Sequence, residues 1–122
     1  PTMFLTRDAA TMRLERERSG GWSEQEIRRT LGGMWAAYQA VPAGHGYHVE
    51  IPGMFHIQFT DLPYWLPYGR ALGLTGPLPG RRGLDIVNAY SLAFFDAELR
   101  GRPAPLLDGR GPRHPEATLR RR

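Results

Sequence analysis

This 122-residue sequence contains no cysteine, no lysine and no apolar run of the roughly 18 or more residues that span a bilayer. The lack of cysteine excludes disulfide bonds, thiolate nucleophiles and thiolate metal ligands. The chain also lacks an initial methionine: it begins at Pro1 and enters an apolar run at once, so we expect a further segment upstream. No charged-then-apolar leader marks secretion, and the sequence leaves a cytoplasmic and a secreted location both open.

The formal net charge of +4 arises from one end of the chain. Residues 1–109 hold 11 arginines and 11 acidic residues, whereas 110–122 hold five arginines and a single acidic residue, Glu116. With little apolar surface to bury, 110–122 is expected to be a basic, disordered tail. Such a tail could contact nucleic acid or acidic lipid. No aromatic side chain is interleaved with its arginines, so no nucleic-acid partner is predicted.

Two segments have the pattern of β-strands. Residues 3–5 form a continuous apolar run, which suits a strand of a parallel sheet that is covered on both faces. Residues 47–51 alternate apolar and polar side chains, and Pro52 and Gly53 end this strand. A long helical segment separates the two strands, so we expect them to be parallel.

The segment between the strands carries the clearest helical signal. Ser23 and Glu26 form a capping box, and apolar residues then recur at helical spacing. Gly32 and Gly33 interrupt this pattern, so the helix is expected either to kink or to pack closely against another backbone there. A second helix is predicted over 83–99. Together the strands and helices predict the α/β fold class.

His56 follows the second strand, in the segment Gly-Met-Phe-His-Ile-Gln-Phe-Thr-Asp over 53–61. This segment resembles the Gly-x-x-His-x-x-Phe-x-Asp pattern around the catalytic histidine of plasma-type platelet-activating factor acetylhydrolases and their bacterial esterase relatives. Residues 85–95 resemble the last helix of that family, and Leu-Leu-Asp-Gly over 106–109 resembles the segment that follows it. The resemblance covers roughly 1–9 and 47–109.

This resemblance implies that residues 1–109 are the C-terminal portion of an α/β-hydrolase domain, with the last two strands of a mostly parallel sheet. The implied activity is that of a carboxylic ester hydrolase, esterase- or lipase-like, which acts on a small-molecule ester through a Ser-His-Asp mechanism and needs no cofactor. His56 would take the proton of the serine hydroxyl and pass it to the leaving alcohol. The alternative is a structural histidine that is bonded to a backbone carbonyl.

A serine nucleophile is missing from the sequence. The pattern Gly-x-Ser-x-Gly does not occur, and Ser19, Ser23 and Ser91 do not fit the strand-to-helix turn that it needs. The nucleophile is therefore expected outside this chain. The chain alone is expected to be inactive.

Asp8 is the candidate triad acid, because it directly follows the first strand. Its alternative role is the N-cap of a short helix that runs to about residue 18. In the acetylhydrolase branch the acid lies after an earlier strand, which would place it upstream of Pro1. Asp61 matches the family segment and is interpreted as a turn residue or helix cap.

Residues near His56 in sequence are expected to wall the substrate pocket. These apolar and aromatic residues are Met54, Phe55, Phe59, Tyr64 and Trp65. The sequence also leaves open a function other than catalysis, that of a non-catalytic, hydrolase-derived binding domain with an Arg-rich tail over 110–122.

Three residues have the chemistry of a metal site. His45, His48 and Glu50 all carry possible ligand atoms. His48 and Glu50 share one face of the second strand, and no further ligand is near in sequence. No metal site is therefore predicted.

Overall fold

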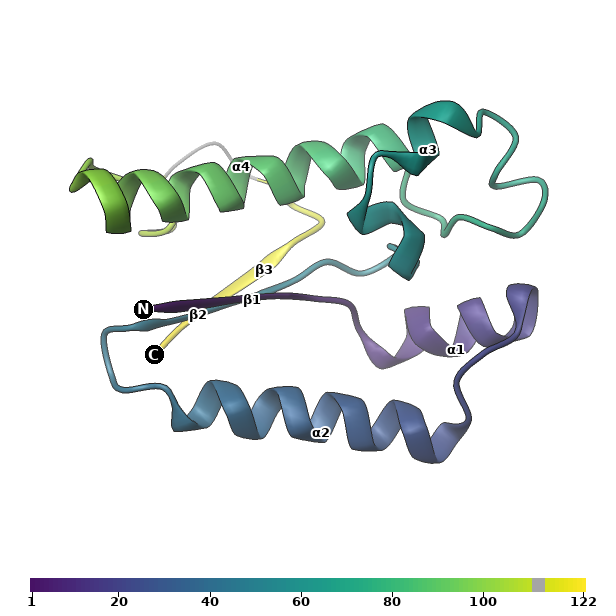
Figure 1. Cartoon of the computed structure of the whole chain (residues 1–122), viewed down its shortest axis with the longest axis horizontal. Helices are drawn as coiled ribbons and strands as arrows, with labels where there is room; N and C mark the ends of the chain where they lie inside the picture. Colours follow the sequence, from purple (N-terminus) through teal and green to yellow (C-terminus); the bar gives the residue numbers. More distant parts are fainter. Residues whose placement is uncertain (111–113) are drawn as a thin grey trace.

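The computed structural model describes residues 1–110 and 114–122, and Figure 1 shows three layers in them. A sheet of strand order β1-β2-β3 lies between α1 and α2 on one side and α4 on the other. β1 (Thr2–Thr6) and β2 (Gly46–Glu50) are parallel, and α1 (Ala9–Ser19) and α2 (Glu24–Ala40) form the crossover between them. The predicted α/β class and the parallel pairing are confirmed.

The third strand corrects the prediction for the tail. β3 (Thr118–Arg121) pairs antiparallel with β2, and the Arg122 N–H donates to the Gly46 carbonyl over 2.9 Å. Leu119 packs against the core. The predicted disorder is therefore wrong for 118–122. The part of that prediction that concerns 111–113 lies outside the described residues. The open edge of β2 supplies hydrogen-bond partners that the tail sequence does not reveal.

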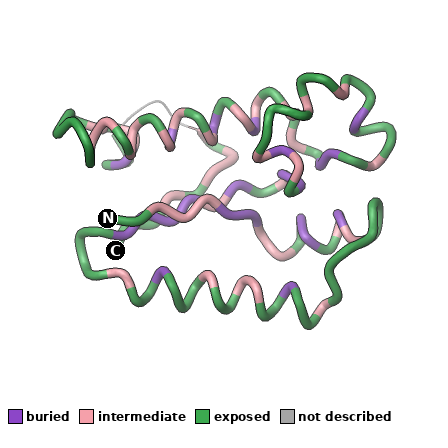
Figure 2. The backbone as a smooth tube through the Cα atoms, viewed as in Figure 1, coloured by how far each residue is buried: buried purple, intermediate pink, exposed green. Residues whose placement is uncertain are grey.

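The main core lies between the sheet and α4. η1 (His56–Phe59) and α3 (Leu62–Trp65) lead from β2 towards α4 (Gly80–Arg100), which ends at Gly101 in the left-handed conformation. Figure 2 shows the buried residues along the strands and on the inner sides of the helices. The buried cluster comprises Tyr47, Val49, Ile51, Met54, Ile86, Tyr90 and Leu107. Within the described residues, no helix has both the length and the apolar character that crossing a membrane requires.

The opposite face of the sheet is packed less tightly by α2. Ile27 and Tyr38 are buried, and the Tyr38 ring meets Phe4 edge to face with 6.2 Å between the ring centroids. Midway along α2, no atom lies within 4 Å of a Cβ built at Gly32 or Gly33. The predicted close approach of another backbone at these glycines is therefore wrong. Hollows remain between this part of α2 and the sheet.

Candidate active site

The segment that carries His56 begins with a tight turn after β2. Gly53 has a positive φ of 83°, a conformation that side chains other than glycine rarely adopt. Its N–H donates to Thr11 Oγ1 over 2.7 Å, and its carbonyl accepts from the Leu78 N–H over 3.0 Å. Gly76 approaches so closely that a Cβ there would collide with the Gly53 carbonyl oxygen. The turn is thus fixed from two sides, by α1 and by the segment before α4.

Gln58 holds the same segment from within. Its side chain is fully buried, and Oε1 accepts from the N–H groups of Phe55 over 2.9 Å and Gly76 over 2.6 Å. Its Nε2 donates to the Leu78 carbonyl over 2.7 Å. Buried amides of this kind must satisfy their polar atoms, and here the satisfied amide locks η1 in place. The backbone that presents His56 is therefore rigidly supported.

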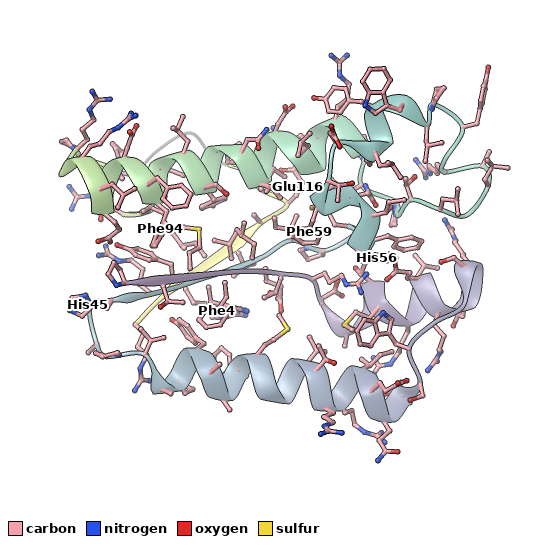
Figure 3. The ribbon with its side chains drawn as sticks, viewed as in Figure 1. Phe4, His45, His56, Phe59, Phe94 and Glu116 are labelled. Carbon is pink, nitrogen blue, oxygen red and sulfur yellow. The ribbon has the colours of Figure 1, made fainter. Side chains whose placement is uncertain are left out.

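The side chain of His56 stands out from this support, and 73% of it is exposed. Its Nδ1 contacts Oε1 of Glu15, and the same oxygen accepts the His56 backbone N–H over 3.1 Å. Figure 3 places His56 and Phe59 at one end of the sheet, above α1. A carboxylate accepts hydrogen bonds, so Nδ1 is the ring nitrogen that donates in this contact, and in the neutral form of the ring Nε2 is then the acceptor. An exposed Nε2 in this state can take up a proton.

Glu15 is held in turn by a charged residue, Arg7. Its side chain is only 3% exposed, and its Oε2 accepts a hydrogen bond from Arg7 at the end of β1. One carboxylate therefore joins α1 to the strand end through one oxygen and to His56 through the other. No sequence motif identifies Glu15. It lies three residues after buried Met12, on the inner face of α1, where an acidic residue is a recognisable anomaly.

Asp8, the predicted triad acid, lies at the start of α1 rather than against Nδ1 of His56. It is the N-cap of α1, where its carboxylate accepts hydrogen bonds from the Thr11 N–H over 3.4 Å and from the Thr11 hydroxyl. This is the alternative role that the sequence left open. The structure brings Glu15, rather than Asp8, against Nδ1 of His56. Asp61 likewise stands at an N-cap position, at the start of α3.

The five residues predicted to wall the substrate pocket lie in different surroundings. Phe59 lines a cavity together with His56. Phe55 is 0% exposed and packs inside the protein, where no substrate can touch it. Trp65 is 77% exposed and lines a separate hollow with Asp61 and Tyr64. Nearness to His56 in the sequence therefore does not by itself place a side chain in this cavity.

His48 belongs to a second polar cluster on the α2 side of the sheet. Its Nε2 lies 3.0 Å from Thr6 Oγ1, and its Nδ1 lies 3.3 Å from an Arg120 nitrogen. Burial lowers the pKa of His48, and the Arg120 charge lowers it further. His45 lies at the opposite end of the sheet from His56 (Figure 3). Within residues 1–110 and 114–122, no group of three or more possible ligands is arranged to hold a metal ion.

The tail arginines also have partners in this structure. Arg121 binds Asp108 over 2.7 Å, and Arg122 donates to the Val41 carbonyl over 2.6 Å. Arg82 forms a two-pronged pair with Glu116 at 2.8 and 2.9 Å, which lowers the pKa of Glu116 to about 2. These contacts tie 114–122 to the body of the domain.

One solved structure with a similar fold is a ferulic acid esterase from Streptomyces cinnamoneus. The TM-score is 0.63 at 27% sequence identity, and the match covers 98% of this chain and 33% of the esterase chain. The present chain therefore spans about a third of that esterase. No protein-family model matches the chain, and no curated protein matches it either. The likeness supports a hydrolase-like α/β fold, while the acetylhydrolase branch stays a prediction.

Proposed function

We propose that this chain is part of a serine-type carboxylic ester hydrolase and supplies its catalytic histidine, His56. The observation that carries the proposal is the exposed imidazole whose Nδ1 is held by a buried carboxylate, Glu15. This is the geometry of a general base in ester hydrolysis. The similar structure of a ferulic acid esterase supports the same activity.

In the proposed reaction, His56 Nε2 accepts the proton of a serine hydroxyl as its oxygen attacks the ester carbonyl carbon. The tetrahedral intermediate collapses, the C–O bond to the alcohol breaks, and His56 returns the proton to the leaving alkoxide. Water then attacks the acyl-serine with the same assistance from His56. The products are the free acid, the alcohol and the regenerated serine.

The serine itself is proposed to lie outside these 122 residues. Within the chain, the Ser19 hydroxyl donates to the Glu15 carbonyl over 3.0 Å, and Ser23 caps α2. Ser91 lies inside α4. Each serine therefore has a place in helix structure rather than on a nucleophile turn.

Glu15 is proposed as the positioning residue for His56. Its carboxylate fixes the tautomer with the proton on Nδ1, and its negative charge stabilises the imidazolium that forms during proton transfer. Arg7 orients this carboxylate, because Oε2 accepts a hydrogen bond from its guanidinium. Both groups are largely shielded from water, which strengthens their effect on the ring.

The decisive experiment replaces His56 with alanine in the full-length protein and measures the hydrolysis of methyl acetate and methyl benzoate. We expect kcat to fall on the order of 10⁴-fold or more with the circular dichroism spectrum unchanged. His45→Ala is the matched control, since His45 is exposed at the other end of the sheet. Undiminished turnover in His56→Ala would refute the proposal.

A further inference from the structure

A hollow that is open to solvent lies at the N-terminal end of α4, apart from the cavity that His56 lines. Figure 1 shows α3 and the loop after it against this end of the helix. Gly80, the first residue of α4, approaches Pro63 of α3 so closely that a Cβ on the glycine would collide with the proline ring. Two arginines, Arg70 and Arg81, belong to the wall of the hollow, and no acidic residue of the described chain does.

These two arginines have no acidic partner. Within residues 1–110 and 114–122, neither guanidinium forms an ion pair with a carboxylate, whereas the neighbouring Arg82 binds Glu116. The Arg81 guanidinium lies over the Tyr64 ring, 5.2 Å from the ring centroid. Such a cation–π contact orients the side chain without neutralising its charge. The hollow therefore carries two positive charges that the described residues do not balance.

The first turn of α4 adds hydrogen-bond donors to the same wall. The helix has no side-chain cap at Pro79 and no acidic residue in its first turn. N–H groups in the first turn have no acceptor within a helix. In the described part of the chain, those of Gly80, Arg81 and Arg82 have none elsewhere either. The N-terminal end of a helix carries a partial positive charge, so successive arginines there favour a nearby anion.

Thr75 provides an independent indication of a bound group. It is 6% exposed and lines the hollow. Its N–H donates to the Gly69 carbonyl over 3.3 Å, but its hydroxyl has no hydrogen-bond partner among the described residues. Buried polar side chains are ordinarily hydrogen-bonded. The hydroxyl is thus available to a group that enters the hollow.

We propose that this hollow binds a phosphate group. Arg70 and Arg81 supply the positive charge, while the first-turn N–H groups of α4 and the Thr75 hydroxyl donate to the phosphate oxygens. Donors that come from two side-chain cations, a hydroxyl and a helix terminus suit a dianion with several acceptor oxygens. The binding does not depend on the proposed hydrolase function, because His56 is not part of this hollow.

Calorimetric titration of the full-length protein with sodium phosphate tests the site. Ionic strength is held constant, and sodium chloride is the comparison for charge screening. We expect saturable binding of one phosphate per chain, weakened about 10-fold or more in Arg70→Gln and in Arg81→Gln, because each variant loses a charged hydrogen-bond donor. Circular dichroism without phosphate should be the same in both variants and the wild type, since both side chains are exposed.

Arg29→Gln is the matched control for these variants. Arg29 is exposed on α2 and, within the described residues, forms no ion pair. It should bind phosphate as tightly as the wild type. Heats of phosphate equal to those of sodium chloride would overturn the inference. So would equal phosphate affinity in the wild type and in both hollow variants.

A phosphate group occurs in soluble molecules and in lipid headgroups, and vesicle sedimentation separates these sources. The vesicles contain phosphatidylcholine and phosphatidic acid in equal parts. Sedimentation that Arg81→Gln weakens and inorganic phosphate reverses would assign the group to a lipid headgroup. Saturable phosphate binding without sedimentation would assign it to a soluble molecule. Active esterase that binds no phosphate would refute this site alone, and loss of activity in His56→Ala with phosphate binding intact would support both proposals.

Discussion

Nδ1 of His56 lies against Oε1 of Glu15, although 41 residues separate the two in sequence. α1 carries Glu15 back from the end of β1, and the turn at Gly53 delivers His56 from the end of β2. Parallel pairing of the two strands brings these ends together. The crossover topology thus brings the two residues together, and a buried hydrogen bond from Arg7 holds the Glu15 carboxylate in place.

The first prediction concerns the charge of Glu15. Glu15→Gln keeps the side-chain volume but removes the carboxylate, so the preferred His56 tautomer and the stabilisation of its imidazolium are lost. We expect kcat for ester hydrolysis to fall about 10³- to 10⁴-fold with little change in KM. Nitrogen-15 NMR of His56 should report a proton shifted from Nδ1 to Nε2, which a purely structural role would not require.

Glu17→Gln is the matched control for this change, since Glu17 is an exposed residue of the same helix. It should leave both kcat and the His56 spectrum as in the wild type. Full activity in Glu15→Gln would show that another group orients His56.

The second prediction concerns Arg7. Arg7→Met leaves the buried Glu15 carboxylate without its cationic partner, and breaking such a pair costs about 3–5 kcal/mol of unfolding free energy. Urea denaturation measures this loss. The double variant Arg7→Met with Glu15→Met should recover much of the stability, because two apolar side chains replace the pair, yet it should remain inactive.

An exposed pair provides the comparison for Arg7. Arg13 binds Glu24 across the helix pair over 2.7 Å, and water screens this contact. Arg13→Met should therefore change stability far less than Arg7→Met. A similar loss in both variants would mean that the Arg7–Glu15 pair has no special role.

Local sequence signals are enough to predict most of the helices and strands. The capping box at Ser23 and Glu26 forms as predicted, and the alternation after residue 46 forms β2. Gly101 ends α4 as expected. Each of these features is set by residues that are close together in the chain, so the local sequence is enough to predict it. β3 depends instead on the edge of β2, more than 60 residues away, and half of its own residues are arginine.

The site was predictable only where the motif itself is specific. The segment around His56 indicates it as the candidate catalytic histidine, whereas Glu15 lies on another element and no pattern in 53–61 indicates it. Phe55 adjoins His56 in sequence, yet its side chain is buried in the core while that of His56 is exposed. Along an irregular turn, neighbouring side chains diverge, so sequence proximity does not identify pocket residues. The cavity wall is instead assembled from four elements.

The third prediction tests how Gln58 supports the site. Gln58→Ala leaves the buried N–H groups of Phe55 and Gly76 without acceptors, at about 1–3 kcal/mol for each group. We expect a lower urea midpoint and faster amide hydrogen exchange at Phe55 and Gly76. Gln25→Ala, at an exposed position in the first turn of α2, is the control and should change neither. Unchanged exchange in Gln58→Ala would contradict the proposed support.

The last prediction is a pH dependence of stability that arises at His48. Trp35 and Tyr38 pack around its ring, and this burial lowers its pKa from the ordinary value of 6.5; the Arg120 charge lowers it too, while Glu50 acts in the opposite direction. Below about pH 6.5 the unfolded chain therefore binds a proton that the folded protein does not, so stability is complete above this pH and declines as the pH falls.

Urea denaturation across this range should show a smaller pH dependence in His48→Gln than in the wild type. The amide that this substitution introduces cannot titrate, although its oxygen and nitrogen can still bond to Thr6 and Arg120. His45→Gln is the matched control, because His45 is exposed and should leave the wild-type slope intact. If the stability of His48→Gln depended on pH just as that of the wild type does, the pKa of His48 would be the same in the folded and unfolded states. The acid sensitivity would then come from other groups.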